Sequence, residues 1–527
     1  MDRTQRLTLI ATGLGLFMIF LDALIVNVAL PDIQRGFGVG EAGLQWVVAA
    51  YSLGMAIFIM QAATLADLYG RRRWYVAGIA VFTLASIACG LAPSLDMLNF
   101  ARGVQGVAAA TANVTSLALV SAAFPDPKEK ARAIGIWTAI ASVGTAVGPT
   151  LGGLLVEHLG WRSIFLVNVP VGLVVIFLTL RFVSESRDER PRQFDLVGQS
   201  LFVVTVGSFA YAVIEGPKAG WASPLILALF ATAAVGCWIF VWFERRSQDP
   251  MMDVSLFRDP AYALAILTIC TVFFSIYGML LLTTQFLQNV RGYSPEATGL
   301  MILPFSASVT IVSPLIGRLV GRFGARPPIL IGLATMILGL LSLIAGGHGN
   351  VVVVLVGLGL LGTGGAMCLT PITTIAMTSV PPERAGMASG IMSAQRAIGS
   401  TVGFAVLGSV LAAWLSATLE PDLASAVPDP VERRAVAAAI VSSANPRAHV
   451  AEIGPRQPIV HPNPATRAAI VAVAERDFVQ GIRAALLVAV ALLFIVLLAG
   501  MRWFPRGGGA MMSDAEREAA KLAGSEG

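Results

Sequence analysis

The chain has 527 residues, of which 56% are hydrophobic and 13% are charged, whereas soluble domains carry about 25% charged residues. A string of soluble domains is therefore excluded, and apolar runs of about 20 residues, long enough to cross a bilayer as helices, recur along the sequence. These runs do not alternate with the period of two that a β-barrel requires. The composition predicts an all-α polytopic membrane protein.

Fourteen spans are predicted, at residues 8–30, 44–66, 75–92, 98–124, 133–157, 164–183, 196–215, 224–243, 261–287, 297–320, 328–346, 351–380, 386–416 and 481–503. With the N-terminus inside, the short inner segments contain nineteen Lys and Arg residues and the short outer loops contain four. This asymmetry follows the positive-inside rule and predicts that both termini are cytoplasmic. The net charge of +5 is explained by this topology, so no nucleic-acid partner is expected.

The first span contains one carboxylate, Asp22, within the stretch LDALIVNVALP. A charge inside the membrane costs about 2.5–3.5 kcal/mol on insertion scales and usually marks a functional site. Eight residues separate Asp22 from Pro31, which places Asp22 roughly 12 Å below the outer surface at 1.5 Å per residue. The competing interpretation is an aspartate at a helix end whose charge is satisfied by water among the lipid head groups.

The inner loop DLYGRRRW, after the second span, has a counterpart after the tenth span. Leu65-Ala-Asp67-x-x-Gly70-Arg71-Arg72 aligns with Leu319-Val-Gly321-x-x-Gly324-Ala-Arg326 at an offset of 254 residues. A repeat of unchanged orientation suggests two parallel six-helix halves. We therefore expect an N-terminal bundle at 1–195, an inserted helix pair with an inner linker at 196–260, a C-terminal bundle at 261–503 and a cytoplasmic tail at 504–527. Asp67 is expected to bond the loop and a helix N-terminus as part of an inner gate, or simply to cap its own loop.

The fourth span contains the second intramembrane charge, Arg102, in LNFARGVQGVAAA. Arg102 and Asp22 are each other's nearest plausible partners in the N-terminal half, and buried charges are usually paired. Burial favours the neutral form of a carboxylic acid and a nearby guanidinium favours the charged form, so a small movement of Arg102 would switch Asp22 between them. A static ion pair that only holds the two spans together is the alternative.

The fifth span contains the tightest motif, which is built from Gly144, Gly148, Pro149, Gly152 and Gly153. Glycines at i, i+4 and i+8 form a flat face that another helix can approach closely, and the proline removes one helical hydrogen bond. In the C-terminal half, Arg396 is an intramembrane charge for which the spans of that half offer no carboxylate partner, so it is expected to pair with substrate or with a backbone carbonyl. The candidate substrate-cavity residues are the polar or aromatic ones at mid-span: Tyr51, Asn113, Thr115, Tyr277, Gln285, Gln395 and Arg396.

The outer loop at 417–480 is rich in proline, and its segments 431–443 and 465–479 have helical spacing. We expect two short helices lying on the outer surface, acting either at the mouth of a transport path or as a structured linker. The tail after Phe504 is expected to be disordered or weakly helical. The sequence contains no Walker A loop, no GxSxG and no HExxH, and its four histidines lack metal-ligand spacing, so no enzyme, cofactor or metal is expected.

LDALIVNVALP, ADLYGRRR, LNFARGVQGVAAA and GTAVGPTLGG resemble, in order, four signatures of major facilitator drug:proton antiporters. WRSIFLVNVPVG and FLQNVRGYSPEATGLMILP resemble the fourteen-span branch, and the chain is most similar to its spectinomycin/tetracycline efflux pump group. Leu24 and Ala63 depart from the family pattern, which usually has Thr and Gly there.

The resemblance implies alternating access in a bacterial cytoplasmic membrane, with small amphipathic drugs exchanged for protons and membrane lipid as the surroundings. A lipid or metabolite exporter on the same fold, or a non-transporting membrane sensor, remain alternatives. The sequence leaves the oligomeric state open.

Overall fold

The computed structural model describes residues 1–39, 41–187, 195–247, 250–346, 350–378, 380, 385–443 and 464–505, and every regular element in these ranges is helical. Fourteen helices there are long and apolar enough to cross a membrane, which confirms the predicted number. The first six spans are α1 (Arg3–Phe37), α2 (Glu41–Tyr69), α3 (Arg71–Gly90), α4 (Leu95–Ala123), α5 (Pro127–Leu159), and α6 (Ser163–Leu166) with α7 (Asn168–Phe182). The others are α8 (Leu196–Ala219), α9 (Pro224–Glu244), α10 (Pro260–Gln285), α11 (Pro295–Phe323), α12 (Arg326–Gly346), α13 (Val351–Thr378), α14 (Ala385–Asp422) and α17 (Pro464–Trp503).

Local sequence fixes where several of these helices begin. The side chains of Ser94, Asp259 and Ser294 accept hydrogen bonds from backbone N–H groups in the first turns of α4, α10 and α11. Such caps satisfy N–H groups that have no partner inside the helix. α10 continues into a π-helical turn, η2 (Phe286–Val290), a rare geometry that is frequent at functional sites.

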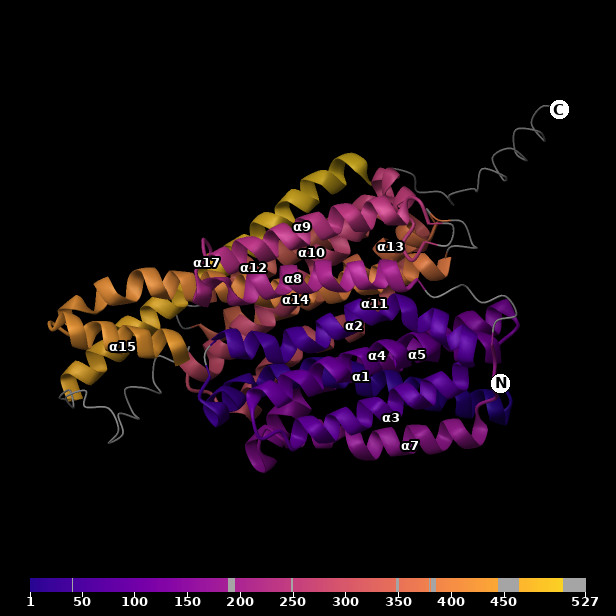
Figure 1. Cartoon of the computed structure of the whole chain (residues 1–527), viewed down its shortest axis with the longest axis horizontal. Helices are drawn as coiled ribbons and strands as arrows, with labels where there is room; N and C mark the ends of the chain where they lie inside the picture. The colour runs from indigo at the N-terminus through magenta and orange to yellow at the C-terminus, as the bar shows by residue number, and fades with distance from the viewer. Residues whose placement is uncertain are drawn as a thin grey trace.

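The spans lie side by side along the long axis of the molecule (Figure 1). In the N-terminal half, α1 packs on α5 and α7, and α2 packs on α4. In the C-terminal half, α10 packs on α14, and α12 packs on α13. The two sets of helices meet along α2 with α14 and along α5 with α11.

The helix α8 contacts both α2 and α14, beside the seam between them. Gln199 of α8 donates from Nε2 to the carbonyl oxygen of Ile57 in α2 at 2.7 Å. Ser409 of α14 donates from Oγ to the carbonyl oxygen of Val213 in α8 at 3.2 Å. Helix α8 is thereby hydrogen-bonded to α2 of the N-terminal half and to α14 of the C-terminal half.

Both members of the predicted loop repeat turn at a glycine. Gly70 has φ = +101° and Gly324 has φ = +77°. Residues with a side chain rarely adopt positive φ, so glycine is the residue that makes these turns without strain. Each turn reverses the chain between two long helices, α2 and α3 in one half and α11 and α12 in the other.

The predicted pair of short helices on the outer surface is partly wrong. Helix α15 (Pro430–Ser443) is present, but residues 465–479 are the first turns of α17 and continue directly into the last span. The ends of α14 and α17 and helix α15 project together beyond the rest of the bundle, opposite the N-terminus (Figure 1). We call this the outer end, because the charge distribution predicts that it faces outward.

The projection has an apolar core of its own, which explains why α14 and α17 extend past the other spans. Leu423 and Val427 lie buried against Ile440 of α15 and Ile470 of α17. Burial of such side chains is worth about 1.5–3 kcal/mol each, more than separate short helices on the surface would gain. Residues 444–463, and the predicted tail beyond residue 505, lie outside the described residues.

Candidate functional site

Asp22 and Arg102 form an ion pair in the interior of the N-terminal half. Nη1 of Arg102 lies 2.6 Å from Oδ2 of Asp22, and both side chains have 0% of their surface exposed. Sequence reasoning paired these residues, and the structure brings them into direct contact. An aspartate at a helix end bathed in head-group water is therefore excluded.

Asp22 accepts hydrogen bonds from three side chains on two other helices. Besides Arg102, Nε2 of Gln105 donates to Oδ1 at 2.9 Å and Nδ2 of Asn168 donates to the same oxygen at 2.8 Å. Gln105 also donates to Oγ of Ser86 on α3 at 2.8 Å. The network thus joins α1, α3, α4 and α7 through hydrogen bonds between buried side chains.

Arg102 is held on several sides. Its Nε donates to the carbonyl oxygen of Val47 at 3.1 Å and its Nη1 also donates to Oε1 of Gln105 at 2.7 Å. The guanidinium carbon lies 4.2 Å from the ring centre of Tyr51 and 5.7 Å from that of Phe165. Nη2 is buried and forms no hydrogen bond with the described residues. The cation is desolvated, and aromatic faces and one carboxylate take the place of water.

The glycine motif of α5 positions the helix that carries Asp22. A methyl group built at Gly144 would lie 2.5 Å from the carbonyl oxygen of Phe17, and one at Gly152 would lie 2.8–2.9 Å from atoms of Ile25. Gly148 of α5 faces Leu24 of α1. The three glycines at i, i+4 and i+8 therefore let α1 approach α5 on both sides of Asp22.

The remaining residues of this motif face the other half of the molecule. A methyl group at Gly153 would collide with the carbonyl oxygen of Pro295 in α11, and one at Gly299 would collide with that of Pro149. Thr150 donates from Oγ1 to the carbonyl oxygen of Gly299 at 3.4 Å. Helix α5 thus contacts α1, which carries Asp22, with one face and contacts α11 of the C-terminal half with another.

The inner loop after α2 is held in a way the sequence did not predict. Asp67, in the last turn of α2, pairs with Arg71, the first residue of α3, at 2.7 Å. The N-terminus of α3 is instead bonded by Glu185, which follows α7: its two carboxylate oxygens accept the N–H groups of Arg72 and Arg73 at 2.9 and 3.2 Å. A carboxylate is favourable there because it meets the positive end of the helix dipole.

The cavity candidates of the N-terminal half are not gathered in one place. Tyr51 is buried against Arg102 and donates to the carbonyl oxygen of Ile19 at 3.3 Å, so it belongs to the charged network. Thr115 is buried and donates to the carbonyl oxygen of Thr111 in its own helix. Asn113 is half-buried on the same helix.

In the C-terminal half, Arg396 and Tyr277 share an aromatic partner. The guanidinium carbon of Arg396 lies 5.7 Å from the ring centre of Phe273, which stacks on Tyr277 with ring centres 6.0 Å apart. Tyr277 in turn meets Phe404 edge-on and packs against the N-terminal core cluster that includes Leu21. Arg396 forms no ion pair with any carboxylate among the described residues. Gln285 is buried at the end of α10, and Gln395 is half-buried beside Arg396.

Sequence reasoning missed Gln105, Asn168, Ser86 and Glu185. Gln105 and Asn168 lie in stretches that had been singled out, and each is an amide inside an apolar span. An uncharged polar side chain at that depth needs a partner just as a charge does. This signal identifies the two amides. Only the fold shows that Ser86 contacts Gln105 and that Glu185 contacts the start of α3. Within the described ranges, no cluster of three His, Cys, Asp or Glu residues is placed to hold a metal ion.

Comparison with known proteins identifies the family. The family model described as Major Facilitator Superfamily matches residues 12–404. The chain is 72% identical over 506 residues to "Multidrug resistance protein Stp" of Mycobacterium tuberculosis strain CDC 1551 / Oshkosh, covering 96% of this chain and 93% of that protein. It is 46% identical to "Drug efflux pump JefA" of the same strain, covering 96% of this chain and 99% of that protein. It is 33% identical to "Tetracenomycin C resistance and export protein" of Streptomyces glaucescens, covering 81% and 82%.

A solved structure shares the fold at low sequence identity. It is a bacterial homologue of the human lysosomal transporter Spinster, in an inward-facing and unoccupied conformation, with a TM-score of 0.63 and 18% identity over 96% of this chain and 99% of that one. The family match and the fold agree with the resemblance seen in the sequence motifs, and this chain belongs to the major facilitator superfamily.

Proposed function

We propose that this protein exports small amphipathic drugs from the cytoplasm in exchange for protons, with Asp22 as the proton acceptor and Arg102 as the group that controls it. The observation that carries the coupling is the fully buried ion pair of these two residues. The observation that carries the cargo is the similarity, over 96% of the chain, to proteins named for multidrug resistance and drug efflux.

The present contacts of Asp22 are arranged around two acceptor oxygens. The carboxylate has two oxygens, and three side-chain N–H groups point at them. A proton on Oδ2 would remove the negative charge that Nη1 of Arg102 faces at 2.6 Å and would add a second donor beside that N–H group. In the proposed cycle, uptake of a proton therefore releases Arg102, and the return of Arg102 expels the proton. This link between position and protonation is what coupled export requires.

The proposed movement is a rocking of the N-terminal helices (1–195) against the C-terminal helices (261–503). At the outer end the two sets are in contact: Nε2 of Gln288 donates to the carbonyl oxygen of Val28 at 2.9 Å, and His158 lies 3.5 Å from Glu296. Opening to the outside separates these contacts. Because α5 packs against both α1 and α11, its displacement would be felt at the helix that carries Asp22.

The proposed orientation places both termini in the cytoplasm, so that protons reach Asp22 from outside and the drug leaves by the same side. One charge that crosses 100 mV releases about 2.3 kcal/mol, and a tenfold concentration ratio costs about 1.4 kcal/mol. One proton per cycle therefore sustains an outward gradient of more than tenfold for an uncharged drug, whereas exchange of one proton for a monovalent cation moves no net charge and is driven by the pH gradient alone. The inner-loop pair of Asp67 and Arg71 and the bond from Glu185 would hold the inner ends of α2 and α3 during this cycle.

The test uses purified protein in liposomes with an imposed pH gradient and follows a fluorescent amphipathic cation and a labelled lipid in the same preparation. We expect the cation to move uphill, and collapse of the gradient with a protonophore to stop it. Movement of the lipid alone would assign the chain to lipid export. Movement of neither, with correctly inserted protein, would favour a non-transporting sensor.

A further inference from the structure

Gln105 of α4 contacts both members of the buried ion pair through opposite ends of one amide group. Its Nε2 donates to Oδ1 of Asp22 at 2.9 Å, and its Oε1 accepts from Nη1 of Arg102 at 2.7 Å. The side chain of Gln105 is fully buried. An amide carries a donor and an acceptor side by side and has no net charge. Gln105 can therefore bond the carboxyl group of Asp22 whether or not that group is charged.

The acceptor end of this amide and the second oxygen of Asp22 share one donor. Nη1 of Arg102 lies 2.6 Å from Oδ2 of Asp22 and 2.7 Å from Oε1 of Gln105. The two oxygens therefore face the same point, and their separation is at most the sum of these distances, about 5.3 Å. Sγ of Cys89, at 3.7 Å, is the other donor to Oε1 that the described residues provide. The shared nitrogen of Arg102 thus stands between two acceptors.

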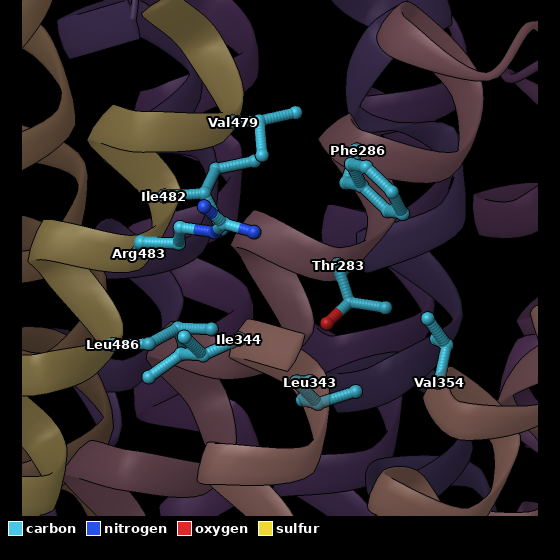
Figure 2. A pocket seen from close by; sticks show the side chains of 9 residues that line it. All are labelled: Thr283, Phe286, Leu343, Ile344, Val354, Val479, Ile482, Arg483 and Leu486. Carbon is cyan, nitrogen blue, oxygen red and sulfur yellow. The ribbon is translucent and has the colours of Figure 1, made fainter. Parts of the chain in front are cut away.

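An arginine elsewhere in the bundle does without an amide neighbour. Arg483 of α17 extends into a pocket between α10, α12, α13 and α17 (Figure 2), and the described residues that line this pocket include no asparagine or glutamine. The side chain of Arg483 is half-buried. Arg102 is fully buried and shares Nη1 between a carboxylate and an amide. We therefore connect the amide of Gln105 with the carboxyl group of Asp22, and not with the packing of an arginine as such.

Entry of a proton together with withdrawal of Arg102 exchanges one donor for another at this point. A hydronium ion gives its proton to Oδ2 of Asp22 and leaves as water, so Oδ2 becomes an O–H donor. Oε1 of Gln105 loses the N–H group of Arg102 at the same time. A buried donor or acceptor without a partner is costly. The new O–H group and the released oxygen are a donor and an acceptor on either side of the vacated position.

We propose that Gln105 replaces Arg102 as the partner of protonated Asp22 by closing a cyclic pair of an amide and a carboxylic acid. Oδ2–H of Asp22 donates to Oε1 of Gln105, and the existing bond from Nε2 to Oδ1 is kept. Nε2 also donates to Oγ of Ser86 at 2.8 Å, and Asn168 donates to Oδ1 at 2.8 Å, so both groups stay in place during the exchange. When Arg102 returns, its Nη1 reclaims both oxygens and the proton leaves. This inference rests on the proposed function and gives Gln105 the role of holding the protonated state.

The experiment follows Asp22 by infrared difference spectroscopy of the full-length protein in liposomes as the pH is lowered. Protonated Asp22 gives a carbonyl stretching band, which Asp22→Asn removes. Neither Tyr51 nor Cys89, the other titratable side chains beside the pair, has a carbonyl group in its side chain. Gln105→Met keeps the length of the side chain but forms neither bond, so it should move the Asp22 band to higher frequency. It should also slow pH-driven drug accumulation by about fivefold or more, because a buried hydrogen bond is lost.

Two variants and one isotope label separate this role from packing. Gln105→Asn keeps an amide and should place the band between those of the unaltered protein and Gln105→Met. Thr111→Val changes another buried residue of α4, whose hydroxyl donates to the carbonyl oxygen of Val107 in the same helix, and should leave band and export unchanged. In the unaltered protein, carbon-13 in the glutamine side-chain amides should reveal an amide band that changes together with the Asp22 band and is absent from Asp22→Asn.

The possible failures of this inference and of the proposed function give different spectra. An Asp22 band that Gln105→Met leaves in place, with no accompanying amide band, would overturn the role of Gln105 and would keep that of Asp22. Equal shifts in Gln105→Met and Thr111→Val would show a packing effect and would also overturn it. The absence of any band that Asp22→Asn removes would overturn the proposed role of Asp22, and this inference with it.

Discussion

The substitution Asp22→Asn probes the buried network with almost no change in shape. Asp22 offers two acceptor oxygens to three donors, whereas an asparagine offers one oxygen and adds two donors of its own. In either orientation of the amide, at least one N–H group of Arg102, Gln105 or Asn168 loses its acceptor. Removal of one partner from a buried ion pair costs about 3–5 kcal/mol. We expect about 3 kcal/mol, because Val47 and Gln105 still accept from Arg102.

The same variant tests the proposed coupling. Asp22→Asn should remain folded and inserted but should lose pH-driven uphill accumulation of drug inside everted membrane vesicles, because no group at that position takes up a proton. Arg102→Ala should also stop export. Normal uphill export by Asp22→Asn would refute the role of Asp22, and normal export by Arg102→Ala would leave only a static ion pair.

A double-mutant cycle separates stability from coupling. The pair Asp22→Asn with Arg102→Gln removes both charges, so it should lose less stability than the sum of the single variants by at least about 1 kcal/mol. The free energy of unfolding of each variant is measured by denaturant titration of the protein in detergent. Export should stay absent in the double variant. Strict additivity of the two single effects would contradict the electrostatic account of the site.

Three further substitutions test the surroundings of the site. Asn168→Leu removes one donor to Asp22 and should cost about 1–2 kcal/mol of stability, measured by the same unfolding assay, together with a reduced export rate. Gly144→Val places methyl groups against the backbone of α1 and should cost about 1–3 kcal/mol and most of the export activity. Gly135→Val, at an open position of the same helix, should do neither, and equal loss by both would contradict the close-approach argument. Glu185→Gln leaves one oxygen for two N–H groups and should speed amide exchange at Arg72 and Arg73 relative to the first turn of α4, which Ser94 caps. Unchanged exchange would show that Glu185 does not hold α3.

The fourteen spans, the position of Asp22 and the identity of its partner were determined by the sequence, because a bilayer imposes strict rules on a chain. A charge inside an apolar run is visible in the sequence, and few residues can neutralise it. The glycines of α5 likewise indicated a close helix contact. The loop repeat aligned Gly70 with Gly324, and both were then found at positive φ.

Tertiary structure alone decided which elements meet. The glycine stripe contacts α1 and not some other helix, Glu185 reaches the start of α3 across more than 110 residues of sequence, and residues 465–479 extend a span instead of lying on the surface. None of these follows from local propensity, since each depends on which apolar faces are buried against each other.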